Sequence, residues 1–368
     1  MSIFLKRRKA VWNQAAKDNK FDGLLVSGVT DVSYLTGFTG DDSMLLISDR
    51  GGSAALLTDG RFDEQAAGEC PGIDIVLREG AMSKSIADQI KTRGISQLGV
   101  QAEFLNVGMQ EAIVKACSKS LKLCTLSSLT ERSRSVKDDD EIRMIRKAIR
   151  VAESAFKELI GKGAGHFIGK TERQLAGELE YLMRLGGADS ASFPTIMCGG
   201  ENGSRCHHLP SSRKIRKDEA VLIDWGARVG GYCSDLTRVV FTGKIPSALK
   251  DIYPVVAEAN RVGIEAVKPR RSGKTVDKAA RDVIAAAGFG KQFVHSLGHG
   301  LGMDVHESPA LSSTSKTSLR PGMVVTVEPG IYIPGVGGIR IEDDVLVTSD
   351  GVQRLTTISR SLRQLVLS

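Results

Sequence analysis

Four acidic residues lie beside apolar, β-prone runs, and their spacing groups them in two pairs. Asp224 and Asp235 stand on either side of a glycine-rich stretch, and each adjoins a run rich in valine and isoleucine. Glu328 follows the apolar residues 323–327, and a turn rich in glycine and proline separates it from Glu342. Two strands joined by a turn place opposing side chains about 5 Å apart. Carboxylates that converge in a half-buried sheet repel one another unless a proton or a cation lies between them. The two hairpins therefore predict one metal site.

The histidines add a nitrogen ligand to this set. The chain has six of them: His166, His207, His208, His295, His299 and His306. His299 lies between two glycines, so the backbone leaves its imidazole free to approach a metal ion. His306 is a candidate donor behind the ligands, whereas His166, beside a helix end and far from the other motifs, is interpreted as structural. Only one of the adjacent His207 and His208 side chains can face the site from extended backbone, and at this point we leave open whether His208 does.

Carboxylates with one imidazole suit manganese(II), cobalt(II) or zinc(II) better than a thiolate-rich site would. Two such ions would share bridging carboxylates and a bridging water, whose pKa falls until hydroxide forms near neutrality. A site of this kind hydrolyses amides or phosphate esters. The residues alone therefore predict a dinuclear metallohydrolase.

The composition indicates what surrounds this site. A chain of 368 residues is too long for one ordinary core and predicts two domains. The net charge of +7 is spread along the chain rather than gathered in a basic stripe, so a nucleic-acid partner is not predicted. No apolar run approaches the roughly 20 residues that cross a bilayer, so no membrane partner is predicted either. The six cysteines show no paired spacing, which predicts free thiols and a cytoplasmic location.

The first part of the chain alternates strand-like and helical patterns, which predicts a small α/β domain over residues 1–133. An amphipathic helix is expected behind the basic residues 6–9. The strand-like segments are 23–26, 34–40, 44–48, 54–61, 73–77 and 98–100, and the helical ones are 63–67, 84–92 and 108–117. Arg61 follows Asp59-Gly60 and is interpreted as a turn residue, although a substrate contact from a neighbouring domain or subunit is the alternative.

A second domain is expected over residues 134–368. Its first helix begins with acidic residues 138–141, which complement the helix dipole, and its second begins at the capping-box pattern of residues 171–174. The first acidic hairpin follows these two helices. Two further helical patterns, 250–267 and 275–287, precede the second acidic hairpin. Because the order helix, helix, hairpin occurs twice, we predict a pseudo-twofold repeat with the acidic hairpins facing each other.

Five motifs of this domain together resemble the Xaa-Pro peptidases, namely prolidase and aminopeptidase P. They are Leu222-Ile223-Asp224-Trp225-Gly226, Ser234-Asp235-Leu236-Thr237-Arg238, Gly298-His299-Gly300-Leu301-Gly302, Val327-Glu328-Pro329-Gly330 and Gly338-Ile339-Arg340-Ile341-Glu342-Asp343. The resemblance extends more loosely to the first domain, at residues 34–38 and 57–61. It implies a creatinase-like N-terminal α/β domain followed by a catalytic domain of the pita-bread fold.

The resemblance also implies a role for each ligand. Asp224 is expected to bind one metal ion, Asp235 and Glu342 to bridge both ions, and His299 with Glu328 to hold the other. The implied cofactor is a pair of divalent ions, with manganese first and cobalt or zinc as alternatives. The implied substrates are peptides with proline at the second position, and the implied assembly is a homodimer.

Further residues receive roles from the resemblance as well. His207 and His306 are implied to bind the substrate and stabilise the tetrahedral intermediate, and His295 matches a further pocket position. Arg340 is expected to orient Glu342 as a bidentate partner and to line the substrate site. Glu328 is the implied general acid and base, a role that a bridging hydroxide could share.

Two departures and several alternatives accompany this interpretation. Trp225 follows Asp224 at a position where the family has a small residue, and Cys206 precedes His207 where the family often has proline. Either departure could alter the pocket or its sensitivity to oxidation, but neither removes a ligand. Dipeptidase and aminopeptidase activity both remain open. Methionine aminopeptidases share the five ligands but usually lack a separate N-terminal domain, and creatinase lacks the ligands. A catalytically silent binding module on the same fold is the alternative of another class, and such modules typically lose the ligands that this chain keeps.

Overall fold

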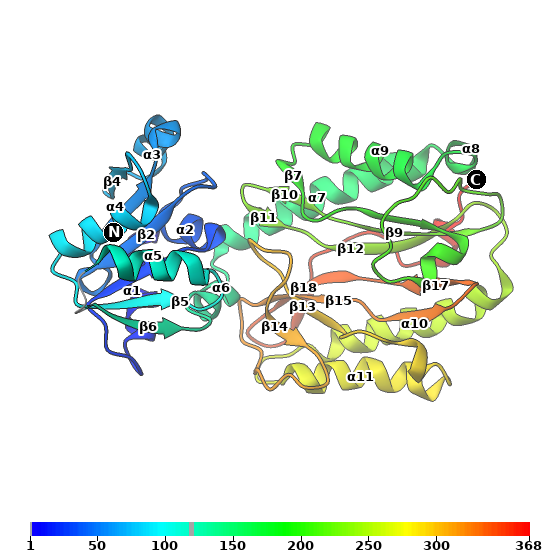
Figure 1. Cartoon of the computed structure of the whole chain (residues 1–368). Helices are drawn as coiled ribbons and strands as arrows, with labels where there is room; N and C mark the ends of the chain where they lie inside the picture. Colours follow the sequence, from blue (N-terminus) through cyan, green and yellow to red (C-terminus); the bar gives the residue numbers. More distant parts are fainter. Residues whose placement is uncertain (1, 118–120) are drawn as a thin grey trace. The chain divides into compact units, whose positions relative to one another are not determined.

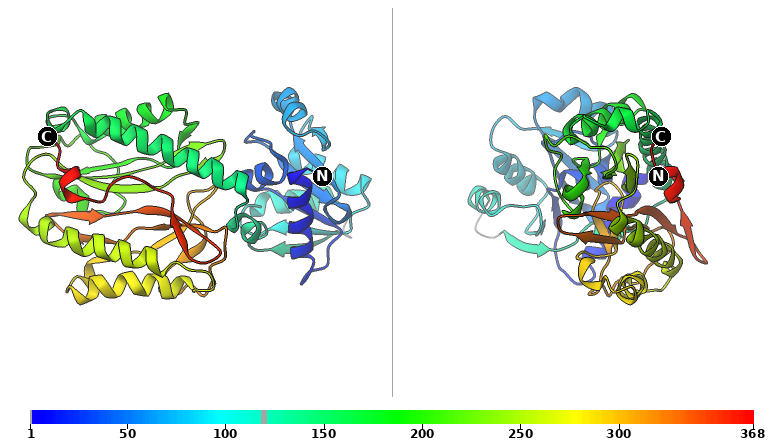
Figure 2. Two further views of the ribbon diagram at one scale, coloured as in Figure 1. Left: turned by 180° about the vertical axis from the view of Figure 1, so that it is seen from behind. Right: turned by 90° about the vertical axis from the view of Figure 1, so that its right-hand side faces the viewer.

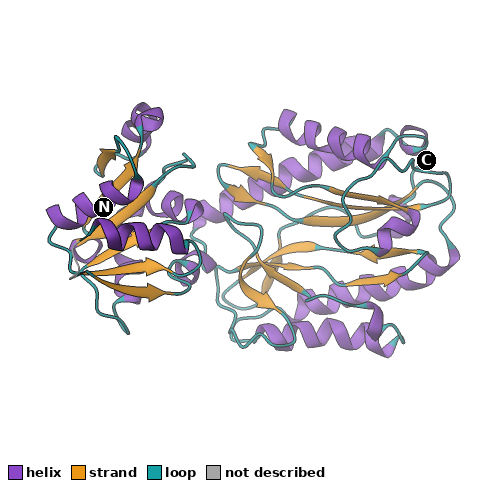
Figure 3. Cartoon of the chain, in the orientation of Figure 1, coloured by secondary structure: helices purple, strands orange, loops and turns teal. Residues whose placement is uncertain are grey.

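The chain forms two compact units, Met1–Arg134 and Ser135–Ser368, in a computed structural model that describes residues 2–117 and 121–368. Figure 1 shows the elements of both units coloured along the sequence. Each unit combines helices with sheets, as Figure 3 shows, which confirms the mixed α/β class. No helix in the described part of the chain is long and apolar enough to cross a membrane.

The first unit is built on a six-stranded sheet with the strand order β4-β3-β2-β1-β5-β6. Its strands are β1 (Gly23–Val26), β2 (Met44–Ser48), β3 (Ser53–Thr58), β4 (Asp74–Leu77), β5 (Gln97–Gln101) and β6 (Lys122–Leu126). Its helices are α1 (Ile3–Ala15), α2 (Val29–Thr36), α3 (Asp63–Glu69), α4 (Met82–Thr92), α5 (Val107–Ala116) and α6 (Glu131–Ser135), the last of which reaches one residue into the second unit. The antiparallel pairs β1–β2 and β2–β3 and the parallel pairs β3–β4, β1–β5 and β5–β6 hold this sheet together.

Two local predictions for this unit were incomplete or wrong. Residues 34–36 were predicted to be strand-like, but they form the last turn of α2, which ends at Gly37 in the left-handed conformation with φ of 86°. The edge strand β6 was not predicted, because its register with β5 is a long-range pairing that the short segment Lys122–Leu126 does not signal.

The second unit begins with two helices that start where the sequence predicts. Asp138 and Glu141 form a capping box at α7 (Asp139–Gly161), and Thr171 and Gln174 form another at α9 (Glu172–Leu185). The remaining helices are α8 (Ala164–Phe167), α10 (Ser247–Ala266), α11 (Gly273–Ala286) and α12 (Leu362–Leu365). In two views, α7 and α9 cover one side of the central strands and α10 and α11 cover the other (Figure 2).

The strands of this unit form several small sheets, with the orders β12-β9-β8, β11-β10-β7, β14-β13-β15-β18-β19 and β16-β17. The first half contributes β7 (Ser190–Ala191), β8 (Ile196–Gly199), β9 (Ala220–Trp225), β10 (Ala227–Val229), β11 (Tyr232–Cys233) and β12 (Leu236–Phe241). The second contributes β13 (Gly298–Gly300), β14 (Glu307–Leu311), β15 (Val324–Val327), β16 (Gly330–Ile333), β17 (Gly337–Arg340), β18 (Asp343–Val347) and β19 (Val352–Arg354). Two helices and a long antiparallel pair thus recur, as the predicted repeat requires.

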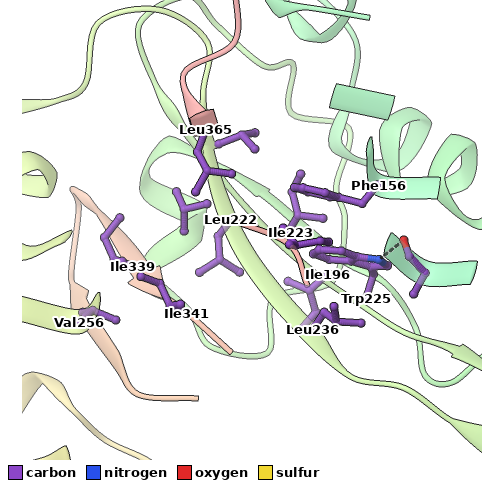
Figure 4. Packing of buried hydrophobic residues seen from close by; sticks show 14 of the residues in the cluster. Phe156, Ile196, Leu222, Ile223, Trp225, Leu236, Val256, Ile339, Ile341 and Leu365 are labelled. Atoms are coloured by element: carbon purple, nitrogen blue, oxygen red, sulfur yellow. Dashed lines mark hydrogen bonds between the residues drawn. The ribbon is translucent and has the colours of Figure 1, made fainter. Parts of the chain in front are cut away.

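The core of the second unit lies between its helices and strands, as Figure 4 shows around Trp225. The Trp225 ring is fully buried and stacks on Phe156 of α7 at 4.4 Å between centroids. Its indole N–H donates to the carbonyl of Ala152, so the one polar atom of the side chain is satisfied. Truncation of a side chain packed in this way typically costs about 3–5 kcal/mol. This contact anchors β9, the strand that carries Asp224, to α7.

Candidate metal centre and substrate pocket

One cavity of about 470 Å³ in the second unit collects the residues singled out from the sequence. It is lined by all nine of the predicted site residues: Asp224, Asp235, Glu328, Glu342, His207, His295, His299, His306 and Arg340. Apolar groups such as Phe193 and Val305 complete the lining. A cavity of this size with a few convergent polar groups is typical of a small-ligand site.

The second acidic pair lies at an interruption of a long antiparallel ladder. On one side of the interruption Val327 of β15 pairs with Asp343 of β18, and on the other Gly330 of β16 pairs with Arg340 of β17. Both halves keep the same register, so Glu328 and Glu342 occupy opposite positions in the gap. The predicted geometry of opposing carboxylates on two arms is therefore present, with a break in the ladder where the ligands lie.

The first acidic pair lies at the end of the β9–β12 ladder. Asp224 pairs with Thr237, and Asp235 comes just beyond Leu236, the last paired residue of β12. The chain opposite Asp235 passes so close that a Cβ on Gly226 would lie 1.9 Å from the carbonyl oxygen of Ser234. Glycine at position 226 therefore allows the two arms to approach where the carboxylates converge.

The two hairpins meet at His299 on β13. Single ligand atoms of Asp235, His299 and Glu342 all lie within 4.8 Å of one another. The His299 Nε2 atom is 3.6 Å from Asp235 Oδ2 and 3.2 Å from Glu328 Oε1. Its Nδ1 lies 3.1 Å from the carbonyl oxygen of Gly300, which as a hydrogen-bond acceptor fixes the tautomer that leaves Nε2 free to bind a metal.

The charges of this cluster are balanced only in part. Burial, and then the neighbouring carboxylates, raise the pKa of Asp235 and of Glu342 well above their ordinary values. Burial would also raise the pKa of Glu328, but without metal a protonated His299 donates to this carboxylate, and its hydrogen bond and charge hold the pKa at about 2. Asp224 Oδ1 and Glu342 Oε1 are buried without a hydrogen-bond partner. The cluster thus has more carboxylate oxygens than hydrogen-bond donors to satisfy them, together with one imidazole nitrogen. Such a set of atoms is suited to binding divalent metal ions.

Arg340 was predicted to hold Glu342 directly, and this prediction is wrong. Its guanidinium forms an ion pair with Asp224 instead. Its Nε donates to Thr237 Oγ1 over 2.9 Å, and Thr237 Oγ1 donates to Glu342 Oε2 over 2.7 Å. A third bond runs from Nη1 to the hydroxyl of Tyr332. Thr237 is thus the link between Arg340 and Glu342.

Thr237 and Tyr332 were not singled out from the sequence. For Thr237 a signal existed, because it lies two residues after Asp235 at the head of a strand and therefore on the same face. Tyr332 gave no such signal, since it lies within the apolar strand β16 and reaches Arg340 only through the fold.

The histidines separate into two groups. His306 lies beside His299 with 4.3 Å between ring centroids, and His295 Nε2 lies 2.9 Å from the hydroxyl of Tyr332. His207 lines the same cavity. His208 instead turns toward the buried Glu172, with Nε2 3.8 Å from its carboxylate, and His166 interacts with Glu178. The adjacent pair therefore presents His207 to the cavity.

The two departures from the family pattern have different outcomes. Trp225 points away from the cavity into the core, because successive residues of β9 face opposite sides and Asp224 takes the cavity side. An effect of Trp225 on the pocket lining was therefore a wrong expectation. Cys206, by contrast, is half-buried and lines the cavity next to His207.

Comparison with known proteins defines the class to which this fold and cavity belong. Residues 143–349 match metallopeptidase family M24, and residues 8–136 match the creatinase/prolidase N-terminal domain. The chain belongs to metallopeptidase family M24 and has the N-terminal domain of the creatinases and prolidases.

Individual relatives agree with this assignment over nearly the whole chain. The chain is 41% identical over 348 residues to an uncharacterized peptidase, YqhT, of Bacillus subtilis, which covers 94% of this chain and 96% of the relative. An Xaa-Pro dipeptidase from Bacillus anthracis has a structure with a TM-score of 0.91 at 36% identity, covering 99% of both chains. An X-Pro aminopeptidase from Thermotoga maritima has a TM-score of 0.86 at 33% identity, covering 95% of this chain and 99% of its own.

Proposed function

We propose that this protein is a dinuclear metallo-exopeptidase that hydrolyses the bond between an N-terminal residue and a following proline. The observation that carries the proposal is the convergence of Asp235, His299 and Glu342 in one cavity of a family M24 fold. Asp224 and Glu328 line the same cavity and complete a set of five ligands.

In this proposal Asp224 would bind one ion, and His299 and Glu328 would bind the other. Asp235 and Glu342 would bind both ions. The unpaired oxygens, Asp224 Oδ1 and Glu342 Oε1, are the atoms available for this purpose. Manganese(II) is the ion we propose first, with cobalt(II) and zinc(II) as alternatives that accept the same ligands. When bound, such a pair of ions lowers the pKa of coordinated water and polarises the scissile carbonyl.

The side chains around the ligands supply the remaining chemistry. Glu328 lies on the cavity wall beside His299, where its carboxylate can accept a proton from water and return it to the departing proline nitrogen. His207 and His306 line the cavity as donors toward the carbonyl oxygen on which negative charge develops. Arg340 fixes Asp224 and, through Thr237, Glu342.

The substrate preference is proposed from the relatives. The structures similar to this chain include an Xaa-Pro dipeptidase and an X-Pro aminopeptidase, so the family resemblance alone leaves the preferred peptide length open. A proline nitrogen bears no hydrogen, and the apolar part of the cavity lining suits such an imide better than an ordinary peptide N–H. The homodimer implied by the family resemblance and the cytoplasmic location expected from the cysteines remain predictions.

The decisive experiment measures peptide cleavage by the purified protein with manganese. Ala-Pro, Ala-Pro-Ala and a longer peptide with proline at the second position should be compared, with Ala-Ala as the matched peptide that lacks the imide. Release of alanine from at least one proline peptide, and not from Ala-Ala, is expected. Cleavage of Ala-Pro alone would define a dipeptidase. A protein that binds metal but cleaves none of these peptides would contradict the proposal.

A further inference from the structure

A buried amide on helix α10 connects the two strand ends that carry Glu328 and Glu342. Asn260 has no exposed surface. Its Nδ2 donates to the carbonyl oxygen of Val327 over 2.9 Å and to that of Ile341 over 3.1 Å. These carbonyls belong to the residues immediately before the two proposed ligands. One side chain therefore fixes the backbone on both arms of the second acidic hairpin.

The position of these bonds in the ladder explains why an outside donor is needed. β15 ends at Val327 and β17 ends at Arg340, so Ile341 and Glu342 lie in the interruption of the ladder. Backbone carbonyls in a buried gap need a donor from elsewhere, because an unpaired one carries a desolvation cost. Across this gap the Ile341 N–H donates to the Pro329 carbonyl oxygen over 3.4 Å, and Asn260 supplies the donors for the carbonyl oxygens of Val327 and Ile341.

The orientation of the Asn260 amide is fixed from its other side. Arg360 Nη1 donates to Asn260 Oδ1 over 2.6 Å, and the same nitrogen lies 3.7 Å from Asp343 Oδ2. A reversed amide would place its NH₂ group against the guanidinium and its oxygen against two carbonyls, so only one orientation satisfies all three bonds. The amide is therefore a rigid spacer rather than an adaptable contact.

The helix itself is pressed against the strand at the same place. Gly263 lies one turn after Asn260 on the same face of α10, and a Cβ there would be 2.9 Å from Val327 Cγ1. Close approach at Gly263 and the two bonds of Asn260 thus act on Val327 together. A side chain at position 263 would collide with Val327, so glycine there allows α10 to approach β15 closely.

We propose that Asn260 is a positioning residue of the metal centre, which sets the separation of Glu328 from Glu342 by bridging the carbonyls of Val327 and Ile341. The proposal rests on the proposed function, since it assumes that these two carboxylates hold metal ions. Without both donors the flanking β15–β18 and β16–β17 ladders still join the two arms, but the backbone immediately before Glu328 and Glu342 loses its shared anchor, and the separation of the two carboxylates is less closely fixed. The first consequence is weaker binding of the ion that needs Glu328 and Glu342 together.

The test is manganese(II) chloride titrated by calorimetry into protein stripped with a chelator, with the spin-coupled signal of paired manganese ions as a second readout. Asn260→Asp keeps the shape of the side chain and an acceptor for Arg360 but loses both donors. The weaker of its two manganese sites is expected to lose roughly 10–100-fold in affinity, the range typical when a residue that hydrogen-bonds to a metal ligand is mutated. Asn260→Ala repeats the measurement without the added charge.

Tyr253→Phe is the matched control on the same helix. The buried Tyr253 hydroxyl donates to the backbone carbonyl of Arg360 and not to the guanidinium that binds Asn260, so this variant also loses one buried hydrogen bond but keeps the three bonds of the Asn260 amide. Manganese affinity should stay within about 3-fold of wild type, well below the 10–100-fold range expected for Asn260. Wild-type affinity in folded Asn260→Asp or Asn260→Ala, or an equal loss in Tyr253→Phe, would overturn the inference. Absence of manganese binding by the wild type would instead contradict the proposed function.

Discussion

Both units contain a cluster of carboxylates, but the two clusters differ in whether protein cations balance the negative charge. In the first unit Asp42 and Asp59 share the guanidinium groups of Arg61 and Arg78, with all four nitrogen–oxygen distances at 2.7–2.8 Å. The Arg61 hydrogen bond holds the pKa of Asp59 at about 2. Each acid in this exposed cluster has a protein cation beside it, which agrees with the interpretation of Arg61 as part of a structural turn.

At the cavity of the second unit the acidic side chains outnumber the guanidinium groups. Four carboxylates line the cavity, and the one guanidinium among them, Arg340, pairs with Asp224. The pKa values of Asp235 and Glu342 rise, where that of Asp59 falls. The same residue type thus titrates in opposite directions according to burial and partner. The comparison shows that a metal site differs from a surface ion-pair cluster in having buried carboxylates that no protein cation balances, not in the number of acidic residues.

Removal of a bridging carboxylate tests this difference most severely. Asp235→Ala or Glu342→Ala is expected to abolish Ala-Pro hydrolysis, with a loss beyond the roughly 100-fold typical of partners behind the ligands. Each variant removes an oxygen donor proposed to serve both ions. Turnover of peptide by the manganese-loaded proteins is the measurement, and Asp59→Ala is the matched control, expected to retain wild-type turnover. Activity near wild type in either cavity variant would show that the bridge is assigned to the wrong residues.

Stability of the metal-free protein should depend on pH because of the same unmet charge. The pKa values of Asp235 and Glu342 are raised in the folded state, so their contribution is present below the unfolded values near 4 and is lost as pH rises through the folded values. Chelator-treated protein should therefore melt at a lower temperature at pH 8 than at pH 5.5.

Manganese should reverse this loss. At about 100 times its Kd the ion is expected to add roughly 2.7 kcal/mol to the free energy of unfolding. At one fixed manganese concentration the gain in melting temperature should be larger at pH 8 than at pH 5.5, because protons compete with the metal for the carboxylates at the lower pH and raise the Kd. An equal gain at both pH values would contradict the assignment of raised pKa values to the ligands.

Loss of the Thr237 hydroxyl should have an intermediate effect. Thr237→Val keeps the shape of the side chain but breaks the link between Arg340 and Glu342, and roughly a 10–100-fold loss of activity or manganese affinity is expected. Thr356→Val is a matched control, since Thr356 is also buried and donates to a carboxylate, that of Asp343, away from the cavity lining. Equal manganese affinity in the two variants would show that Thr237 has no special role in the metal centre.

How much of this site was predictable depended on whether the signal was local. The four acids could be found because each adjoins an apolar run, and His299 because glycines flank it. The ion pair of Arg340 with Asp224 could not, because 116 positions separate the two residues and only the packing of β17 against β9 and β12 brings them together. Asn260 is similar: within a helical pattern it is an ordinary polar residue, and its importance comes from carbonyls 67 and 81 positions away.

The fold itself was predictable to a comparable degree. Acidic residues at 138–141 and a capping-box pattern at 171–174 mark two helix starts locally, and α7 and α9 begin there. The break in the long hairpin was not predicted, since a continuous strand–turn–strand pattern gives no reason for residues 328–329 and 341–342 to leave the ladder. The helix at residues 29–36 was missed because its aromatic and β-branched residues favour strands by propensity, while the terminating Gly37 was the signal to weigh.

A paired carboxylate within the second unit should show the smallest effect. Glu178 accepts from Lys162 over 2.7 Å and from Lys170 over 2.9 Å, lies beside His166, and has a pKa of about 2 although burial opposes this. The lowered pKa stabilises the fold above the unfolded value near 4.3, and that contribution is lost as pH falls toward 2. Glu178→Gln should therefore cost about 1 kcal/mol at pH 7 and less at pH 3.

Urea unfolding of wild type and Glu178→Gln at the two pH values measures this difference directly. The direction is opposite to that expected for Asp235 and Glu342, although all three acids belong to the same unit. A loss of unfolding free energy in Glu178→Gln that stayed constant or grew as the pH fell would contradict this prediction. Pairing with lysine would then not explain why the pKa of Glu178 is lowered while the pKa values of the cavity carboxylates are raised. If the loss of unfolding free energy caused by Glu178→Gln becomes smaller at low pH, the direction of a carboxylate's pKa shift is set by its partners and not by the unit in which it lies.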